Sequence, residues 1–283
     1  MLAKRISTIL PKLSFDEALE ITKIYSIAGK LEENKPLITK RPFRSVHHLA
    51  TPVSLIGGGK EPAPGEISLA HLGVLFLDEL PEFNKNVLEL LREPLEDNKI
   101  TINRLNSKVT FPSKFMLVAA MNPCPCGYYG SDEKECVCSE YKISKYMNKI
   151  SGPLLDRIDI QVEVKPVNYK SINENRRTKT SKEIREKVNN AKNIQLERYK
   201  KYNFYSNSEI PTNLVKEYCK LDDKAEKILQ SAFDKLGLSA RAYTRILKVA
   251  RTIADLDGKE VITAEHIAEA IQYRNLDRKY WKN

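Results

Sequence analysis

The feature that most constrains the fold is a pair of short apolar segments, at residues 73–77 and 115–120. Each is dense in large apolar side chains, as expected for a strand that is buried on both faces of a parallel sheet. A third segment, residues 158–164, alternates apolar and polar side chains, which indicates a strand at the edge of the sheet. The first half of the chain is therefore expected to fold around a parallel sheet.

The pattern becomes helical after Pro166, beyond a polar stretch at residues 169–180. Thr180 and Glu183 have the spacing of a capping box, which predicts a helix that runs to about residue 201. Capping residues and helical spacing predict three more helices, which end at Gly237, begin at Ser239 and begin at Thr263. We therefore expect two domains: an α/β core at residues 1–165 and an α-helical domain at residues 166–283.

The composition and the apolar runs indicate where the protein acts and what kind of partner it binds. The longest apolar runs, at residues 74–77 and 116–121, are far shorter than the roughly 20 residues that cross a bilayer. The N-terminus also lacks the residue order of a secretory signal, so we expect a cytoplasmic protein with reduced cysteines. Lysine and arginine (47) exceed aspartate and glutamate (37), which favours an anionic partner such as nucleic acid. A solvated basic surface is the alternative.

The strongest chemical signal is the apolar segment that ends in Asp78 and Glu79. A buried strand that delivers two adjacent carboxylates at its carboxyl end has the form of a Walker B motif. Asp78 would then hold a nucleotide-bound magnesium ion, and Glu79 would polarise the attacking water. The alternative interpretation is an ordinary solvated strand end.

Three further residues are candidates for nucleotide chemistry. Asn122 follows the second apolar segment and could orient the lytic water, although Asn-Pro also favours a plain turn. Arg157 could neutralise charge on a neighbour's γ-phosphate, or it could simply pair with Asp156 or Asp159. Arg241 lies one turn inside a predicted helix, where a bound phosphate would offset its unfavourable interaction with the helix dipole. A generic basic helix face is the alternative for Arg241.

Four of the five cysteines fall within residues 124–138: Cys124, Cys126, Cys136 and Cys138. Paired thiols that close a short polar loop in a reducing compartment favour a tetrahedral zinc site. Free thiols and redox or disulfide chemistry are the alternatives, because the spacing is tighter than the usual two-residue gap. Cys219 lies in a helical stretch and is expected to be a small buried residue.

These segments follow one another in the order of a AAA+ module, and they closely resemble the ComM (YifB-type) group of magnesium-chelatase-like ATPases. The matching segments lie at residues 41–44, 47–48, 64–71, 73–83, 122–127, 152–160 and 241–255. The resemblance implies a P-loop-type AAA+ core with a parallel sheet and flanking helices, followed by an α-helical lid. It also implies roles for named residues: Walker B for Asp78 and Glu79, sensor 1 for Asn122, arginine finger for Arg157 and sensor 2 for Arg241.

The same resemblance implies that residues 99–114 form the hairpin that precedes sensor 1 in this AAA+ branch. Arg104 and Lys108 lie near its tip and are candidates for contact with a DNA strand in a central pore. His47 and His48 match the family, but the sequence gives no physical role for them and loop polarity explains them equally well.

One departure from the family concerns the phosphate-binding loop. The family's Walker A loop precedes a segment like residues 1–5, which here is the chain start. Residues 57–60 do not replace it, because Glu61 follows the lysine where Ser or Thr belongs and Ser54 replaces the first glycine. We therefore expect a chain that lacks the first strand and the P-loop, with little or no ATPase activity by itself.

Three functions are compatible with these patterns. The resemblance implies a homo-oligomeric, hexameric ring that uses ATP and Mg²⁺ to move single-stranded or branched DNA, as in branch migration during recombination and natural transformation. The second function is a chelatase-type ATPase motor that acts on a protein partner for metal insertion, although the sequence shows no chelatase partner domain. The third is a non-catalytic remnant that at most lends Arg157 to an intact neighbour.

Overall fold

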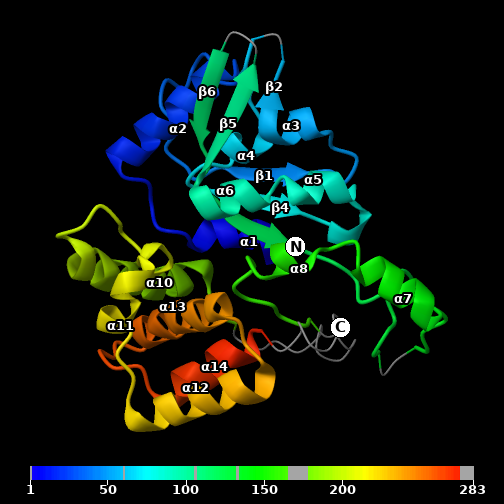
Figure 1. Cartoon of the computed structure of the whole chain (residues 1–283). Coiled ribbons are helices and arrows are strands. Elements are labelled where there is room, and N and C mark those ends of the chain that lie inside the picture. Colours follow the sequence, from blue (N-terminus) through cyan, green and yellow to red (C-terminus); the bar gives the residue numbers. More distant parts are fainter. Residues whose placement is uncertain (1, 60, 105–106, 132–133, 165–177, 275–283) are drawn as a thin grey trace. The chain divides into compact units, whose positions relative to one another are not determined.

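The chain forms two compact units, Met1–Arg157 and Ile158–Asn283. The computed structural model describes all residues except 1, 60, 105–106, 132–133, 165–177 and 275–283 (Figure 1). The domain boundary predicted between residues 165 and 166 lies outside the described residues. None of the described helices is both long enough and apolar enough to span a bilayer.

The first unit is built around a parallel sheet of three strands in the order β1-β4-β7. These strands are β1 (Phe43–Val46), β4 (Val74–Leu77) and β7 (Met116–Ala119), and the last two confirm the predicted apolar strands. β4 is central, and Val74, Leu75 and Leu77 are fully buried. At its start, Gly73 lies so close to β1 that an added Cβ would stand 2.1 Å from the Pro42 carbonyl oxygen. A side chain there would force the two strands apart.

Two expectations about the sheet are corrected. β7 is not buried on both faces as expected, because Met116 is 45% exposed, and β7 lies at an edge of the sheet among the described strands. Residues 158–164 form no strand, and their apolar side chains at positions 160, 162 and 164 are exposed. The segment instead bonds within the second unit, where Gln161 N–H donates to the Tyr273 carbonyl (2.8 Å). Alternation alone cannot make a strand, because a strand also needs a partner for its backbone groups.

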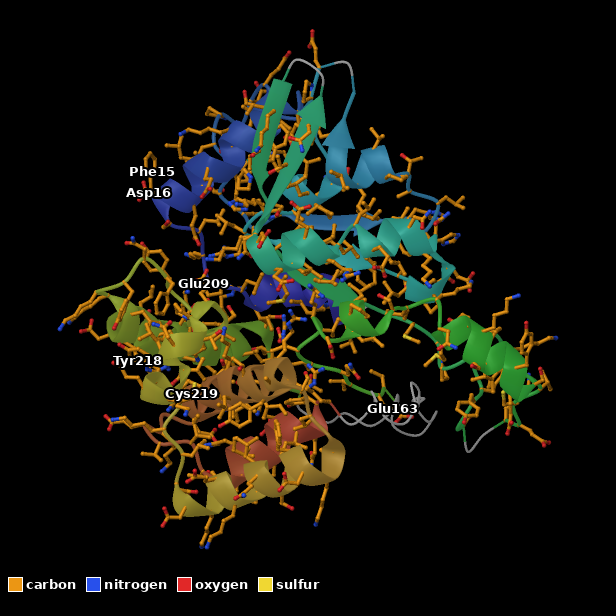
Figure 2. The ribbon with its side chains drawn as sticks, in the orientation of Figure 1. Phe15, Asp16, Glu163, Glu209, Tyr218 and Cys219 are labelled. Carbon is orange, nitrogen blue, oxygen red and sulfur yellow. The ribbon has the colours of Figure 1, made fainter. Side chains whose placement is uncertain are left out.

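Short helices and two hairpins complete the first unit. The hairpins are β2 (Gly57–Gly58) with β3 (Ala63–Pro64), and β5 (Lys99–Arg104) with β6 (Ser107–Pro112). The helices are α1 (Leu2–Ile9), α2 (Phe15–Ile27), α3 (Pro52–Ile56), α4 (Glu66–Leu69), the 3-10 helix η1 (Leu80–Glu82), α5 (Lys85–Glu89), α6 (Arg92–Asp97), α7 (Glu140–Met147) and α8 (Gly152–Leu155). Phe15, at the start of α2, is 70% exposed (Figure 2). The β5–β6 pair confirms the hairpin predicted at residues 99–114.

The second unit is helical, as predicted. Its elements are α10 (Ser181–Tyr199), the 3-10 helices η2 (Asn207–Glu209) and η3 (Thr212–Leu214), α11 (Val215–Tyr218), α12 (Asp223–Leu236), α13 (Ala240–Leu256) and α14 (Ala264–Gln272). The predicted caps are confirmed: Thr180 and Glu183 form a capping box, and Gly237 adopts the left-handed conformation (φ 54°) that ends α12. Cys219, which Figure 2 labels, directly follows α11 and is buried, as expected.

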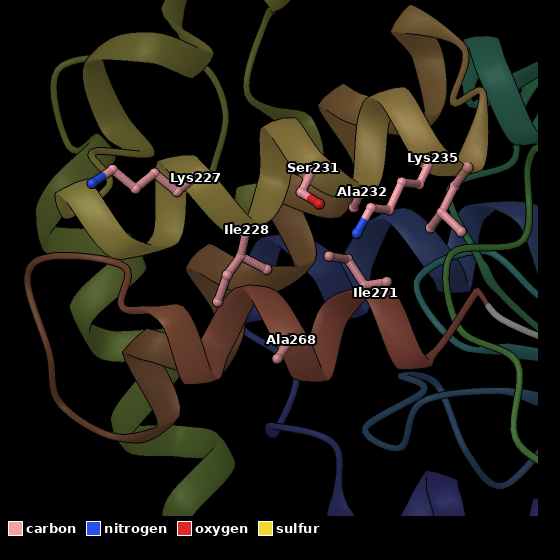
Figure 3. A pocket seen from close by; sticks show the side chains of 8 residues that line it. Lys227, Ile228, Ser231, Ala232, Lys235, Ala268 and Ile271 are labelled. Carbon is pink, nitrogen blue, oxygen red and sulfur yellow. The ribbon is translucent and has the colours of Figure 1, made fainter.

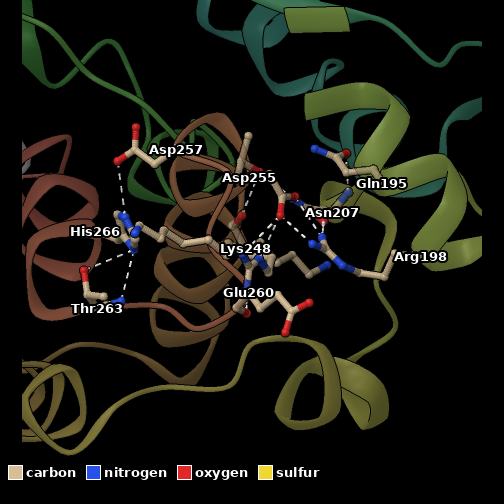
Figure 4. A network of polar contacts seen from close by, with 12 residues as sticks. Gln195, Arg198, Asn207, Lys248, Asp255, Asp257, Glu260, Thr263 and His266 are labelled. Carbon is tan, nitrogen blue, oxygen red and sulfur yellow. Dashed lines mark hydrogen bonds and ion pairs between the residues drawn. The ribbon is translucent and has the colours of Figure 1, made fainter. Parts of the chain in front are cut away.

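A buried polar network ties α10, η2 and α13 together (Figure 4). Asp255 on α13 accepts hydrogen bonds from Arg198 (2.5 and 2.8 Å), from the Asn207 amide (2.8 Å) and from Arg251 Nε (3.1 Å). Arg251 is 1% exposed and also donates to the carbonyls of Lys259 and Glu260. One carboxylate therefore faces two guanidinium groups inside the unit.

Candidate functional site

The predicted Walker B residues and the predicted sensor 1 residue lie at one edge of the sheet, just beyond the ends of two strands. The strand register pairs Val46 with Leu77 and Leu77 with Ala119, so the three strands end side by side. Asp78 and Glu79 follow β4 directly, and Asn122 follows β7; all three are exposed. The carboxyl ends of parallel strands are where open α/β sheets bind ligands.

The backbone of Glu79 is held in an unusual conformation. Its φ of 51° and ψ of 48° lie in the left-handed region, which costs a residue other than glycine roughly 1–2 kcal/mol. Two hydrogen bonds hold the turn: Glu79 N–H donates to Asp78 Oδ1 (3.0 Å), and Leu80 N–H donates to the Ala120 carbonyl (2.9 Å). Such strain persists where the surroundings fix it, and it is common at active sites.

His48 is a candidate site residue to which the sequence alone assigned no role. Its Nδ1 lies 3.3 Å from Glu79 Oε2, and its ring lies against that of His47, with centroids 4.2 Å apart. Both histidines directly follow β1, just as Asp78 and Glu79 follow β4. A predicted strand at β1 would have placed both histidines at the same sheet edge as Glu79. However, a four-residue strand with two polar residues alternates too weakly to be predicted from the sequence.

The backbone of Asn122 lies next to α7. Tyr146, a buried residue of α7, lies beside the backbone of Asn122, and burial raises the pKa of its hydroxyl to about 12. The Asn122 side chain remains exposed at the sheet edge. The start of the loop between β7 and α7 therefore lies beside the helix into which the loop leads.

Arg157 is held within the first unit. Its guanidinium donates to the Pro153 carbonyl (2.7 Å) and pairs with Glu96 of α6, and its side chain is 8% exposed. Asp159, one of the two partners expected from the sequence, pairs instead with Arg245 (2.5 Å). A finger role for Arg157 therefore requires that the pair with Glu96 be exchanged for another partner.

Arg241 belongs to the helical unit, in the first turn of α13, which Ser239 caps. Two cations that follow it on α13 are occupied within this unit: Arg245 pairs with Asp159, and Lys248 donates to the Ser208 carbonyl (2.9 Å). Burial lowers the pKa of Lys248. These contacts disfavour the interpretation of a generic solvated basic face, while the sensor 2 role of Arg241 stays a prediction.

The two candidate DNA contacts lie at the β5–β6 hairpin, which stands out from the sheet in Figure 1. Lys108 is exposed and lies opposite Asn103. Arg104 ends β5 opposite Ser107, and the side chain of Arg104 lies outside the described part of the structure. The hairpin base is anchored by the buried side chains of Ile100 and Phe111.

The cysteine loop brings its four thiols together. The Sγ atoms of the quartet lie within 4.8 Å of one another, in the loop between β7 and α7: Cys124, Cys126, Cys136 and Cys138. Carboxylate oxygens at the sheet edge and thiols in this loop are therefore two chemically distinct candidate metal sites.

A glycine-containing hairpin in the first unit and a groove on the second do not involve the predicted site residues. Gly57 and Gly58 follow α3 and pair with β3 in a hairpin, so the residues around them do not form the strand, loop and helix of a P-loop. A groove of about 490 Å³ on the helical unit, between α12 and α14, is lined by apolar side chains such as Ile228 and Ile271 with Lys227 and Lys235 nearby (Figure 3).

Comparison with known proteins matches both halves of the chain. The family model for magnesium chelatase, subunit ChlI, matches residues 1–172, and the model for the ChlI C-terminal region matches residues 178–274. The chain is 48% identical over 279 residues to competence protein ComM of Haemophilus influenzae and 43% identical over 280 residues to uncharacterized protein YifB of Escherichia coli. Each alignment covers 98% of this chain, with 53% of ComM and 54% of YifB. The chain thus spans about half the length of these relatives.

A more distant match lies in the archaeon Methanocaldococcus jannaschii. Its magnesium-chelatase subunit ChlI homolog is 21% identical over 226 residues, which is 76% of this chain and 52% of that protein.

Proposed function

Because the chain belongs to the magnesium chelatase ChlI family of AAA+ proteins, we propose that it forms the Walker B, sensor and lid part of an ATP-driven cytoplasmic motor that acts on DNA. The observation that carries this proposal is the sheet edge where Asp78, Glu79 and Asn122 follow two adjacent parallel strands. We assign the complete activity to a longer form of this protein that also carries a phosphate-binding loop, since the chain spans about half the length of ComM and YifB.

Each side chain at this edge has a chemical role in the proposal. ATP with Mg²⁺ supplies the phosphoryl group when bound. Asp78 would hold the ion, because carboxylate oxygens are the ligands that Mg²⁺ prefers in proteins. Glu79 would polarise the attacking water and Asn122 would orient it. His48, 3.3 Å from Glu79, would restrain that carboxylate.

The remaining roles require neighbouring subunits. We propose a homo-oligomeric, hexameric ring in which Arg157 of one subunit reaches the nucleotide of the next and exchanges its pair with Glu96 for a γ-phosphate. Arg241 would contact the phosphates from the helical lid. Structural Zn²⁺ in the cysteine loop is the third proposed cofactor, beside ATP and Mg²⁺.

DNA as the substrate rests on three observations. The chain has a formal net charge of +10, and the exposed Lys108 stands on a projecting hairpin. The relative at 48% identity is named a competence protein, which favours a role in natural transformation and recombination. We propose single-stranded or branched DNA as the substrate, because a hairpin that lines the pore of a ring would contact a single DNA strand.

The proposed function is tested by ATP hydrolysis with this chain and with a longer form that carries a Gly-rich loop ending in Lys-Ser/Thr, each with and without branched DNA. Only the longer form is expected to turn over ATP, with stimulation by DNA. Glu79→Gln in the longer form should lower turnover by about 10²–10⁴-fold and leave nucleotide binding intact. The matched control is Glu82→Gln, an exposed glutamate in the same turn. Equal losses in both variants would contradict the role of Glu79.

The hairpin has its own test. Lys108→Ala in the longer form should weaken DNA binding and reduce the slope of log affinity against log salt by about one, because one phosphate contact is lost. Lys23→Ala, which removes an exposed lysine on α2, is the control and should leave both quantities unchanged. If the two variants bind DNA equally well, the hairpin is not the contact.

A chelatase-type motor is the second candidate, because the matching family model describes a magnesium chelatase subunit. Such a motor would act on a protein partner for metal insertion. ATP hydrolysis by the longer form that no DNA stimulates would favour it. No hydrolysis by either form would favour a non-catalytic protein.

A further inference from the structure

We propose that Cys124, Cys126, Cys136 and Cys138 bind one zinc ion as four thiolates, and that this ion fixes the loop that begins at Asn122. The proposal deepens the cofactor part of the proposed function. The zinc site is inferred from the geometry of the loop alone. Its effect on ATP hydrolysis depends on the role that the proposed function gives to Asn122.

The distances between sulfurs fit a single tetrahedral ion. Cys124 Sγ lies 3.4 Å from Cys126 Sγ and 3.7 Å from Cys136 Sγ, and Cys126 and Cys136 are 3.6 Å apart. Four sulfurs at the usual Zn–S distance of about 2.3 Å would stand about 3.8 Å apart. A disulfide needs about 2.05 Å. In an iron–sulfur cluster the four thiolates are divided among two or more iron atoms and spread farther, so a mononuclear site fits best.

The local backbone aims the first pair of cysteines inward. Gly127 adopts a φ of +83° and donates its N–H to the Cys124 carbonyl (3.0 Å), which turns the chain back on itself. Tyr129 N–H then donates to Cys124 Sγ (3.4 Å), a contact that stabilises a thiolate and orients it toward a metal. Cys124 itself is fully buried.

Cys136 and Cys138 bring their sulfur atoms to the first pair from the other end of the loop. Val137, between Cys136 and Cys138, is 85% exposed, whereas both cysteines are partly buried. The next residue, Ser139, caps α7 by accepting from Lys142 N–H (3.4 Å). The cysteines therefore end the loop directly before a fixed helix.

Burial of apolar surface supplies little of the free energy that would gather four thiols here. Most described residues of the loop are exposed or only partly buried, including Tyr128, Lys134 and Glu135. Metal coordination supplies folding free energy directly, and a closed set of four protein ligands is typical of structural zinc. The quartet is therefore better explained as a ligand set than as part of a core.

Both ends of this loop meet at the sheet edge. The loop begins at Asn122, two residues before Cys124, and continues into α7, whose buried Tyr146 lies beside the Asn122 backbone. An ion that closes the loop would thus limit the motion of Asn122. Loss of the ion should loosen residues 122–147 while the sheet itself stays folded.

The first measurement is the metal content of the protein, purified without chelators or a metal-binding tag. We expect about one zinc ion per chain. Cys136→Ser should lower zinc affinity by about tenfold or more, whereas Cys219→Ser, which alters a cysteine outside the quartet, should leave it unchanged. Cobalt added to the zinc-free wild-type protein should give the absorption bands of a tetrahedral thiolate site. This readout holds even if Cys136→Ser fails to fold.

The second measurement is hydrogen exchange with and without a zinc chelator, in the absence of nucleotide. Residues 122–147 should exchange faster when zinc is removed and recover when it is restored, and unchanged exchange would overturn the coupling to Asn122. A reduced protein that carries no zinc and takes up no cobalt would overturn the site, as would disulfides in the intact mass. Since neither measurement needs ATP or DNA, failure here is distinguishable from failure of the motor proposal.

Discussion

Arg157→Ala in the longer form is expected to lower ATP turnover by the assembled ring about 10³–10⁵-fold, which is the effect of removing an arginine finger. The cation would neutralise charge that develops on the γ-phosphate of a neighbouring subunit, so nucleotide binding should change far less than turnover. In this structure the guanidinium lies against Pro153 and Glu96 of its own chain, which makes a purely structural role the competing explanation.

Mixed rings separate the two explanations. Subunits with Arg157→Ala keep Glu79, and subunits with Glu79→Gln keep Arg157, so each is defective in its own ring. A mixture should regain turnover wherever an intact finger meets an intact site, and no recovery would contradict action between subunits. Glu96→Gln is the second control. It removes the resting partner of Arg157 and should leave turnover largely intact, whereas a structural role predicts a loss similar to that of Arg157→Ala.

Much of the fold was predictable because the patterns are local. The apolar runs at residues 73–77 and 115–120 gave β4 and β7, and capping residues such as Thr180 and Gly237 fixed helix ends. The predicted membership of a magnesium-chelatase-like family is confirmed by matches that span both halves of the chain. Motifs of this kind depend on neighbouring residues, so the sequence alone carries them.

What could not be predicted depends on partners that are distant in sequence. Residues 158–164 have the alternation of a strand, but no described strand lies beside them, and Gln161 N–H donates to the Tyr273 carbonyl instead. His48 and Glu79 meet only because β1 pairs with β4. The contact between Glu96 and Arg157 joins residues on α6 and after α8, and no periodicity in either segment signals it.

Asp255→Ala is expected to destabilise the helical unit by about 3–5 kcal/mol, the cost of removing one partner of a buried ion pair. The Asp255 side chain is fully buried and faces both Arg198 and Arg251 (Figure 4). Without it Arg251, which is 1% exposed, would keep its two carbonyl partners but lose its counter-charge. Asn207 would also lose an acceptor, since its amide donates to the same carboxylate (2.8 Å).

The measurement is urea unfolding followed by circular dichroism, with Asp257→Ala as the matched control two residues along the chain. The Asp257 side chain is 63% exposed and lies 3.4 Å from His266, so its loss should cost less than about 1 kcal/mol. Asp255→Asn preserves the side-chain volume but removes the charge. If the unpaired buried cations account for most of the loss, its free energy of unfolding should be close to that of Asp255→Ala. Similar small losses for Asp255→Ala and Asp257→Ala would mean that water reaches Arg251 on substitution and that the network contributes packing rather than charge compensation.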